Sequence, residues 1–262
     1  MEGFHRPALY PVPGASLLVI FVHGFLGGPG QFTGLVRAVN EAGFAAETLL
    51  LPGHGKKSWD FALHAKREWQ ETVNAALSKR LSQYEKVVLM GHSMGGLLSI
   101  NASLKAGPAH GIVLWETPIR LRMRLVGVSN DLQVALLPEK LQSPVAKAYR
   151  QASNVRFYTP LGYLLTVPRA VELLRMMAAT ERELSKIQCP VLLIQSKADE
   201  VVHPGSMERL QRGLVNAKIS TLTLDLSWHS YFPDEELSGI QQRLIAWLKT
   251  LKNQEISSHN ST

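Results

Sequence analysis

Short apolar runs alternate with longer amphipathic segments along most of this chain. The continuous apolar runs are typical of strands that are covered on both faces, and they predict strands at 16–22, 44–51, 86–90, 112–115, 191–195 and 219–226. Apolar residues at helical spacing predict helices at 31–42, 59–81, 94–106, 204–214 and 234–251. This alternation predicts an α/β fold, a mostly parallel central sheet with helices on both faces.

The alternation stops between residues 118 and 186. This stretch is helical in composition, contains no convincing buried strand, and is cut into pieces by four prolines. We interpret 118–186 as a helical lid inserted into a core formed by 1–117 and 187–252. Residues 253–262 are polar and are expected to form a frayed tail.

Composition narrows the class of protein. Of the 262 residues, 45% are hydrophobic and 19% charged, which excludes a disordered chain, a collagen-like repeat and a coiled coil. The single cysteine, Cys189, excludes an intramolecular disulfide and favours a reducing, cytoplasmic location. Residues 1–13 do not resemble a signal peptide, and the apolar run 17–25 is shorter than the ~20 residues of a membrane span. We therefore expect no stable membrane insertion.

The net charge of +7 is concentrated in the predicted lid. Residues 119–186 contain eleven Lys and Arg but five acidic residues. No nucleic-acid-binding signature accompanies this charge, so we expect a solvated basic surface and no nucleic-acid partner. Arg120, Arg122 and Arg124 alternate at the start of the lid, and they leave open the possibility of an anionic substrate.

A nucleophile motif lies between a predicted strand and a predicted helix. Residues 91–96 read GHSMGG and match G-x-S-x-G, directly after the strand KVVLM. In this setting a sharp turn lifts the serine hydroxyl out of the sheet, and flanking glycines avoid steric clashes. The following helix N-terminus favours developing negative charge. Ser93 is therefore the candidate nucleophile.

Four stretches together carry a family resemblance. Besides GHSMGG, the chain has HGFLGG at 23–28, LPGHG at 51–55, and the pair KADEVV at 197–202 with WH at 228–229. The chain resembles the α/β-hydrolase superfamily, in particular its bacterial carboxylesterase and monoacylglycerol lipase-like group. The resemblance implies an α/β-hydrolase fold with an inserted lid and a Ser-Asp-His triad.

Two loops supply the candidate acid and base. Asp199 follows the strand 191–195 and His229 follows the strand 219–226, so both lie at the edge of the sheet that carries Ser93. The alternative base is His203 and the alternative acid is Asp225, whereas Glu200 is expected to be solvated. The family often has glycine before the catalytic histidine, and Trp228 stands there instead.

The resemblance also implies an oxyanion hole. Its donors would be the backbone N–H groups of Phe25 and Met94, with glycines allowing the loop after the first strand to bend toward Ser93. The loop fits neither of the glycine patterns that hold nucleotide phosphates, and no metal-ligand spacing is present, so no cofactor or metal is expected.

These features lead to one function with two alternatives. The chain is expected to be a serine hydrolase that cleaves small carboxylic esters with short to medium acyl chains through an acyl-enzyme. One alternative is a thioesterase or lyase of the same fold acting on an anionic substrate held by the lid arginines. The other is a non-catalytic binding protein that has kept the fold. The oligomeric state stays open.

Overall fold

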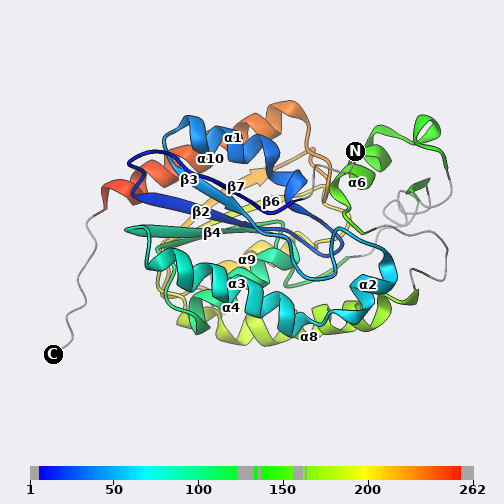
Figure 1. The fold of residues 1–262 in the computed structure, drawn as a ribbon, viewed down its shortest axis with the longest axis horizontal. Coiled ribbons are helices and arrows are strands. Elements are labelled where there is room, and N and C mark those ends of the chain that lie inside the picture. The colour runs from blue at the N-terminus through cyan, green and yellow to red at the C-terminus, as the bar shows by residue number, and fades with distance from the viewer. Residues whose placement is uncertain (1–5, 123–132, 135–136, 156–161, 163, 255–262) are drawn as a thin grey trace.

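The computed structural model describes residues 6–122, 133–134, 137–155, 162 and 164–254. Its centre is a seven-stranded sheet with the order β1-β3-β2-β4-β5-β6-β7 (Figure 1). The strands are β1 (Ala8–Tyr10), β2 (Leu17–Val22), β3 (Ala45–Thr48), β4 (Lys86–His92), β5 (Gly111–Trp115), β6 (Val191–Ser196) and β7 (Ile219–Leu224). All neighbouring pairs are parallel except β1 with β3. The predicted parallel sheet is confirmed.

Both faces of the sheet are covered, which explains the continuous apolar runs. One set of β2 side chains, including Leu17 and Phe21, packs in a cluster under α1 (Thr33–Glu41) and α10 (Asp234–Asn253). The alternate set, including Leu18 and Ile20, packs against α3 (Lys66–Leu81) and α4 (Met94–Lys105) on the opposite face (Figure 1). Every residue of β2 is fully buried, so no polar face interrupts the pattern.

Two elements differ from the sequence prediction. The predicted helix 59–81 is two helices, α2 (Ser58–Leu63) and α3, separated by His64 in an extended conformation. The side chain of Glu68 stabilises the break, because it accepts the backbone N–H of Ala65 at 3.1 Å and contacts His64 Nδ1 at 2.7 Å. The edge strand β1 was not predicted, since its three residues are half or fully exposed and lack a hydrophobic pattern.

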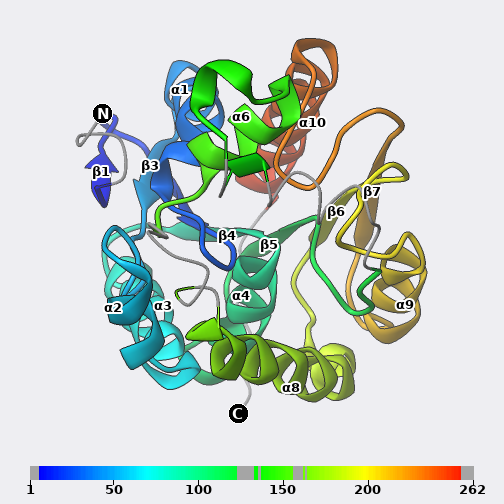
Figure 2. The same ribbon diagram turned by 90° about the vertical axis from the view of Figure 1, so that its right-hand side faces the viewer.

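The described parts of 118–186 include two longer helices, α6 (Pro144–Ala152) and α8 (Val167–Glu183), and two short 3₁₀ turns, Glu139–Leu141 and Leu184–Lys186. In Figure 2, α6 and α8 lie on opposite sides of the ends of β4 and β5. Met176 and Met177 of α8 join the same core cluster as α4. Most of 123–136 and 156–163 lies outside the described residues, so closure of this region over Ser93 and its boundaries as a lid remain predictions.

The remaining helix of the core is α9 (Gly205–Gly213), which follows β6. Predicted and observed ends of the strands and of the other helices differ by a few residues. No helix within the described ranges combines the length and the apolar character needed to cross a bilayer.

Candidate active site

Ser93 occupies a strained turn between β4 and α4. Its backbone has φ 53° and ψ −124°, a conformation that costs a non-glycine residue on the order of 1–3 kcal/mol. The neighbouring glycines make the turn possible: a Cβ on Gly91 would lie 2.3 Å from the backbone of Gly95, and one on Gly95 would lie 2.0 Å from the carbonyl oxygen of Val22. The turn is held by the Ser93 N–H, which donates to the Trp115 carbonyl at 2.8 Å.

Three loops at the carboxyl ends of β4, β6 and β7 bring the predicted site residues together. His229 Nε2 lies 3.0 Å from Ser93 Oγ, and His229 Nδ1 lies 2.8 Å from Asp199 Oδ2. The other carboxylate oxygen of Asp199 accepts the backbone N–H groups of Val201 and Val202, each at 2.7 Å. Asp199 is fully buried, and Ser93 and His229 are less than a tenth exposed. The hydrogen-bonded chain has the geometry that a serine nucleophile and its base require.

The charges of Asp199 and His229 stabilise each other. Burial by itself raises the pKa of Asp199, but the charge and hydrogen bond of His229, together with other hydrogen bonds, lower that pKa to about 2. Burial by itself lowers the pKa of His229, but the charge and hydrogen bond of Asp199 and the charge of Glu200 raise that pKa above its ordinary value. The ionised form of Asp199 therefore favours the protonated form of His229.

The loop that carries His229 is fixed by its backbone. Glu200 Oε2 accepts the His229 N–H at 3.1 Å, and His92 Nε2 lies 2.9 Å from the His229 carbonyl oxygen. Since a carbonyl only accepts, His92 Nε2 carries the proton; burial, then the charge of His229, lower the pKa of His92 to about 3 and keep it neutral. Glu236, in the first turn of α10, accepts the N–H groups of residues 225–227.

The expectation that Glu200 is solvated is wrong. Glu200 is 1% exposed, because its side chain turns inward to bind the His229 N–H. Sequence reasoning also missed the positions of His92 and Glu236. The one sequence signal for Glu236 is its place among three acidic residues in the first turn of a helix, where a carboxylate is favourable and can cap nearby N–H groups.

The predicted oxyanion loop lies against Ser93. A Cβ on Gly24 would be 2.9 Å from Ser93 Cβ, so only glycine allows this approach. His23 holds the loop in place: Nδ1 donates to the Gly24 carbonyl at 3.0 Å, and Nε2 accepts the Leu51 N–H at 3.0 Å. Met94 is the first residue of α4, where a backbone N–H has no intrahelical acceptor. The donor roles of Phe25 and Met94 remain predictions.

The alternative base and acid bind elsewhere. His203 Nδ1 accepts the N–H of Gly205 at 3.0 Å, at the start of α9. Asp225 is 69% exposed at its side chain and pairs with Lys197 at 2.8 Å. The structure places neither residue in the hydrogen-bonded chain that contains Ser93.

The arginines at the start of the predicted lid have separate environments. Arg122 Nε donates to the Asp199 carbonyl at 2.6 Å, and one of its terminal nitrogens donates to the Lys197 carbonyl at 2.8 Å. Arg122 therefore holds the loop that carries Asp199 in place through these two hydrogen bonds. Arg120 is exposed. Arg124 lies outside the described residues.

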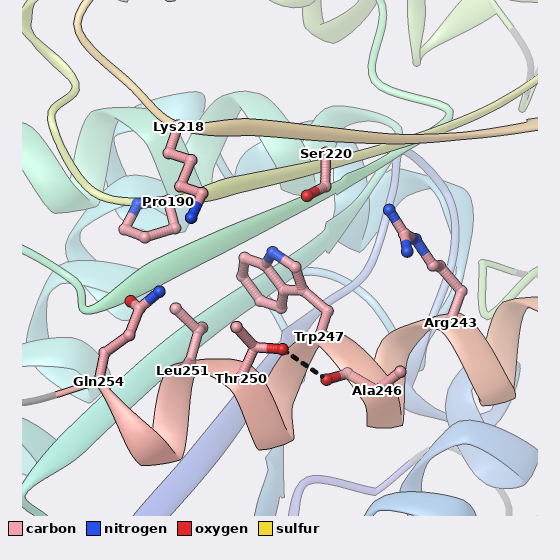
Figure 3. Close-up of a pocket in the computed structure, with 9 residues that line it drawn as sticks. All are labelled: Pro190, Lys218, Ser220, Arg243, Ala246, Trp247, Thr250, Leu251 and Gln254. Atoms are coloured by element: carbon pink, nitrogen blue, oxygen red, sulfur yellow. Dashed lines mark hydrogen bonds between the residues drawn. The ribbon is translucent and has the colours of Figure 1, made fainter.

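A surface groove of about 270 Å³ lies far from this site (Figure 3). Its lining includes Pro190 and Lys218, which precede β6 and β7, and Trp247 and Gln254 of the C-terminal helix region. The groove is therefore at the amino ends of the strands, whereas Ser93, Asp199 and His229 follow the carboxyl ends. In open parallel sheets ligands bind at the carboxyl ends, so this groove is not the candidate site.

Comparison with known proteins identifies the family. The model of Hydrolase_4, described as serine aminopeptidase, S33, matches residues 14–236. The chain belongs to this family. The resemblance to α/β-hydrolases is confirmed, and the protein is a serine hydrolase of the lipase and esterase type.

Individual relatives of this serine hydrolase cover almost its whole length. It is 26% identical over 233 residues to the thermostable monoacylglycerol lipase of Bacillus sp. (strain H-257), covering 87% of this chain and 88% of the relative. It is 21% identical over 251 residues to the carboxylesterase of Bacillus subtilis (strain 168), covering 94% and 97%. The fold is similar to that of the monoacylglycerol lipase of Paleococcus ferrophilus, with a TM-score of 0.69 and 22% identity over 94% of this chain and 99% of the other.

Proposed function

We propose that this serine hydrolase cleaves uncharged carboxylic esters of short to medium acyl chain through an acyl-enzyme on Ser93. The observation that carries the proposal is the buried hydrogen-bonded chain from Ser93 through His229 to Asp199. The printed names of the two bacterial relatives, a monoacylglycerol lipase and a carboxylesterase, support an ester as substrate.

Ser93, His229 and Asp199 each have a role that their geometry allows. His229 Nε2 takes the proton of Ser93 as Oγ attacks the ester carbonyl carbon, and Asp199 stabilises the resulting imidazolium. The backbone N–H groups of Phe25 and Met94 donate to the oxygen that becomes negative. Collapse expels the alcohol, which takes the proton from His229. Water then attacks the acyl-enzyme by the same route and releases the acid.

The surroundings of the arginines favour a neutral ester over an anionic substrate. The Arg122 guanidinium donates hydrogen bonds to two backbone carbonyls of the loop that carries Asp199 (the acid loop), and Arg120 is exposed. A guanidinium buried without an anionic partner is costly, so an arginine inside the pocket would need a charged substrate. We further propose that 118–186 forms the lid and supplies an apolar acyl pocket.

The first experiment labels the protein with a fluorophosphonate and follows turnover of nitrophenyl esters of increasing acyl length. We expect labelling of wild type, no labelling of Ser93→Ala, and a rate loss of several orders of magnitude in that variant. Near-native turnover by Ser93→Ala would refute the assignment of the nucleophile. Labelling without turnover of any ester would instead favour the binding-protein alternative.

A matched pair of variants tests the base. We expect His229→Ala to lose activity to about the level of Ser93→Ala, because members of a triad act as a unit. His203→Asn keeps an acceptor for the Gly205 N–H and should retain near-native activity. Loss of activity in the His203 variant alone would show that the base has been misassigned.

A further inference from the structure

Glu116 is a buried acid beside the candidate triad that the mechanism above does not use. It follows β5 directly and lies between the strands that carry Ser93 and Asp199. Its backbone N–H donates to the Ile194 carbonyl at 2.9 Å, and its side-chain Oε1 accepts the Ser196 N–H at 2.7 Å. The side chain is fully buried, and its backbone has a positive φ of 46°. A glutamate in this strained, dry position requires a physical reason.

The other side-chain oxygen of Glu116, Oε2, indicates what that reason is. Oε2 is buried, and no donor group of the described residues reaches it. The Asp199 side chain lies within hydrogen-bonding reach of the Glu116 side chain. Two ionised carboxylates cannot hydrogen-bond to each other, and their charges repel in a buried site. One proton between them removes the repulsion and forms the bond.

The proton belongs on Glu116. Asp199 already accepts hydrogen bonds from His229 and from two backbone N–H groups, all of which favour its ionised form. Among the described residues, only the Ser196 N–H donates to the Glu116 carboxylate. Burial, followed by the charge and hydrogen bond of Asp199 and the charge of Glu200, raises the pKa of Glu116 well above its ordinary range.

We propose that Glu116 is a positioning residue whose neutral carboxyl group donates a hydrogen bond to the Asp199 carboxylate and so orients it toward His229. This inference rests on the proposed function, because Asp199 is assigned there as the acid of the triad. In this role Glu116 adds a hydrogen bond without adding a third negative charge near His229, beyond those of Asp199 and Glu200.

The charged and titratable groups around Glu116 set the expected pH dependence. Asp199 and Glu200 face it from the loop after β6. His229 lies beyond Asp199, His92 contacts His229, and Arg122 binds the Asp199 carbonyl. A neutral Glu116 contributes no charge to this group, so replacing it with another neutral donor leaves the pKa of His229 unchanged. An ionised Glu116 would raise that pKa, and neutral replacement would lower it.

The kinetic test compares Glu116→Gln with Glu116→Ala on a nitrophenyl ester across the acid limb of kcat/KM. A glutamine amide reproduces both bonds, since its oxygen accepts the Ser196 N–H and its NH₂ donates to Asp199. We expect Glu116→Gln to keep the acid-limb pKa and a rate within a few-fold of wild type. We expect Glu116→Ala to lose about 10- to 100-fold in kcat with little change in KM, as for the loss of one hydrogen bond to a charged group.

Two kinetic results would overturn the proposal. A clear downward shift of the acid limb in Glu116→Gln would show that Glu116 is ionised, and unchanged kcat in Glu116→Ala would show that it positions nothing. A second measurement needs no activity. Infrared difference spectra of wild type against Glu116→Gln at neutral pH should show the carbonyl stretch of a protonated carboxylic acid in wild type only; its absence refutes the proposal. If Ser93 escapes fluorophosphonate labelling while this band is present, the proposed function fails and the protonation of Glu116 stands.

Discussion

Replacing Arg122 with alanine tests whether this arginine stabilises the loop that carries Asp199 or binds substrate. The Arg122 guanidinium donates hydrogen bonds to the backbone carbonyls of Asp199 and Lys197, at 2.6 and 2.8 Å. A hydrogen bond from a charged donor contributes about 1.5–3 kcal/mol when buried. The bond to Asp199 is partly buried and the bond to Lys197 is exposed, so screening by solvent reduces the second. We expect Arg122→Ala to lower the free energy of unfolding by about 2 kcal/mol.

Thermal and urea unfolding measure this loss directly. For a chain of this length, about 2 kcal/mol corresponds to a fall in Tm of roughly 4–8 °C. Arg120→Ala is the matched control, because that side chain is exposed, and its Tm should stay close to wild type. Looser placement of the Asp199 loop should also lower kcat/KM for neutral esters in Arg122→Ala, by up to about tenfold.

Two esters of equal acyl length complete the assay, one ending in methyl and one in carboxylate. If Arg122 acts only on the acid loop, its replacement lowers kcat/KM for both esters by the same factor, and wild type does not prefer the carboxylate. The reasoning is refuted if wild type prefers the carboxylate ester and Arg122→Ala loses that preference at unchanged Tm. That result would promote the anionic-substrate alternative.

Three further predictions concern stability. Glu236→Ala removes the acceptor of three backbone N–H groups, one of them buried, and should cost about 1–3 kcal/mol in urea unfolding, whereas Glu236→Gln keeps part of the acceptor and should cost less. Gly95→Ala should yield no soluble folded protein on expression, because its Cβ would lie 2.0 Å from a carbonyl oxygen of β2; Gly239→Ala, in α10 with open space around it, should stabilise by about 0.5–1 kcal/mol. The pKa of His92 is about 3 in the folded protein and about 6.5 in the unfolded chain, so between these pH values the unfolded chain binds the extra proton and the free energy of unfolding decreases as the pH is lowered. From pH 7 to pH 5 this group lowers the free energy of unfolding by about 2 kcal/mol, and urea titrations should find that loss abolished in His92→Gln.

The sequence by itself determined the parts of the protein that depend on local pattern. Strands buried on both faces are continuously apolar, so six of the seven strands could be located from apolar runs. The turn at Ser93 needs glycine at fixed neighbouring positions, which leaves a readable motif. Asp199 and His229 could be named because parallel strands place their carboxyl ends at one edge of the sheet, whatever the loops do.

Only the tertiary structure decided what surrounds those residues. Glu116 contacts Ser196 across 80 positions, Arg122 contacts Asp199 across 77, and His92 contacts His229 across 137. No periodicity records such a contact, and a glutamate after a strand reads the same whether it is solvated or buried. Whether Glu200 points to water or to the His229 backbone depends on the packing of two loops. Side-chain burial and charge state at the site are therefore set by long-range packing, which a local pattern does not encode.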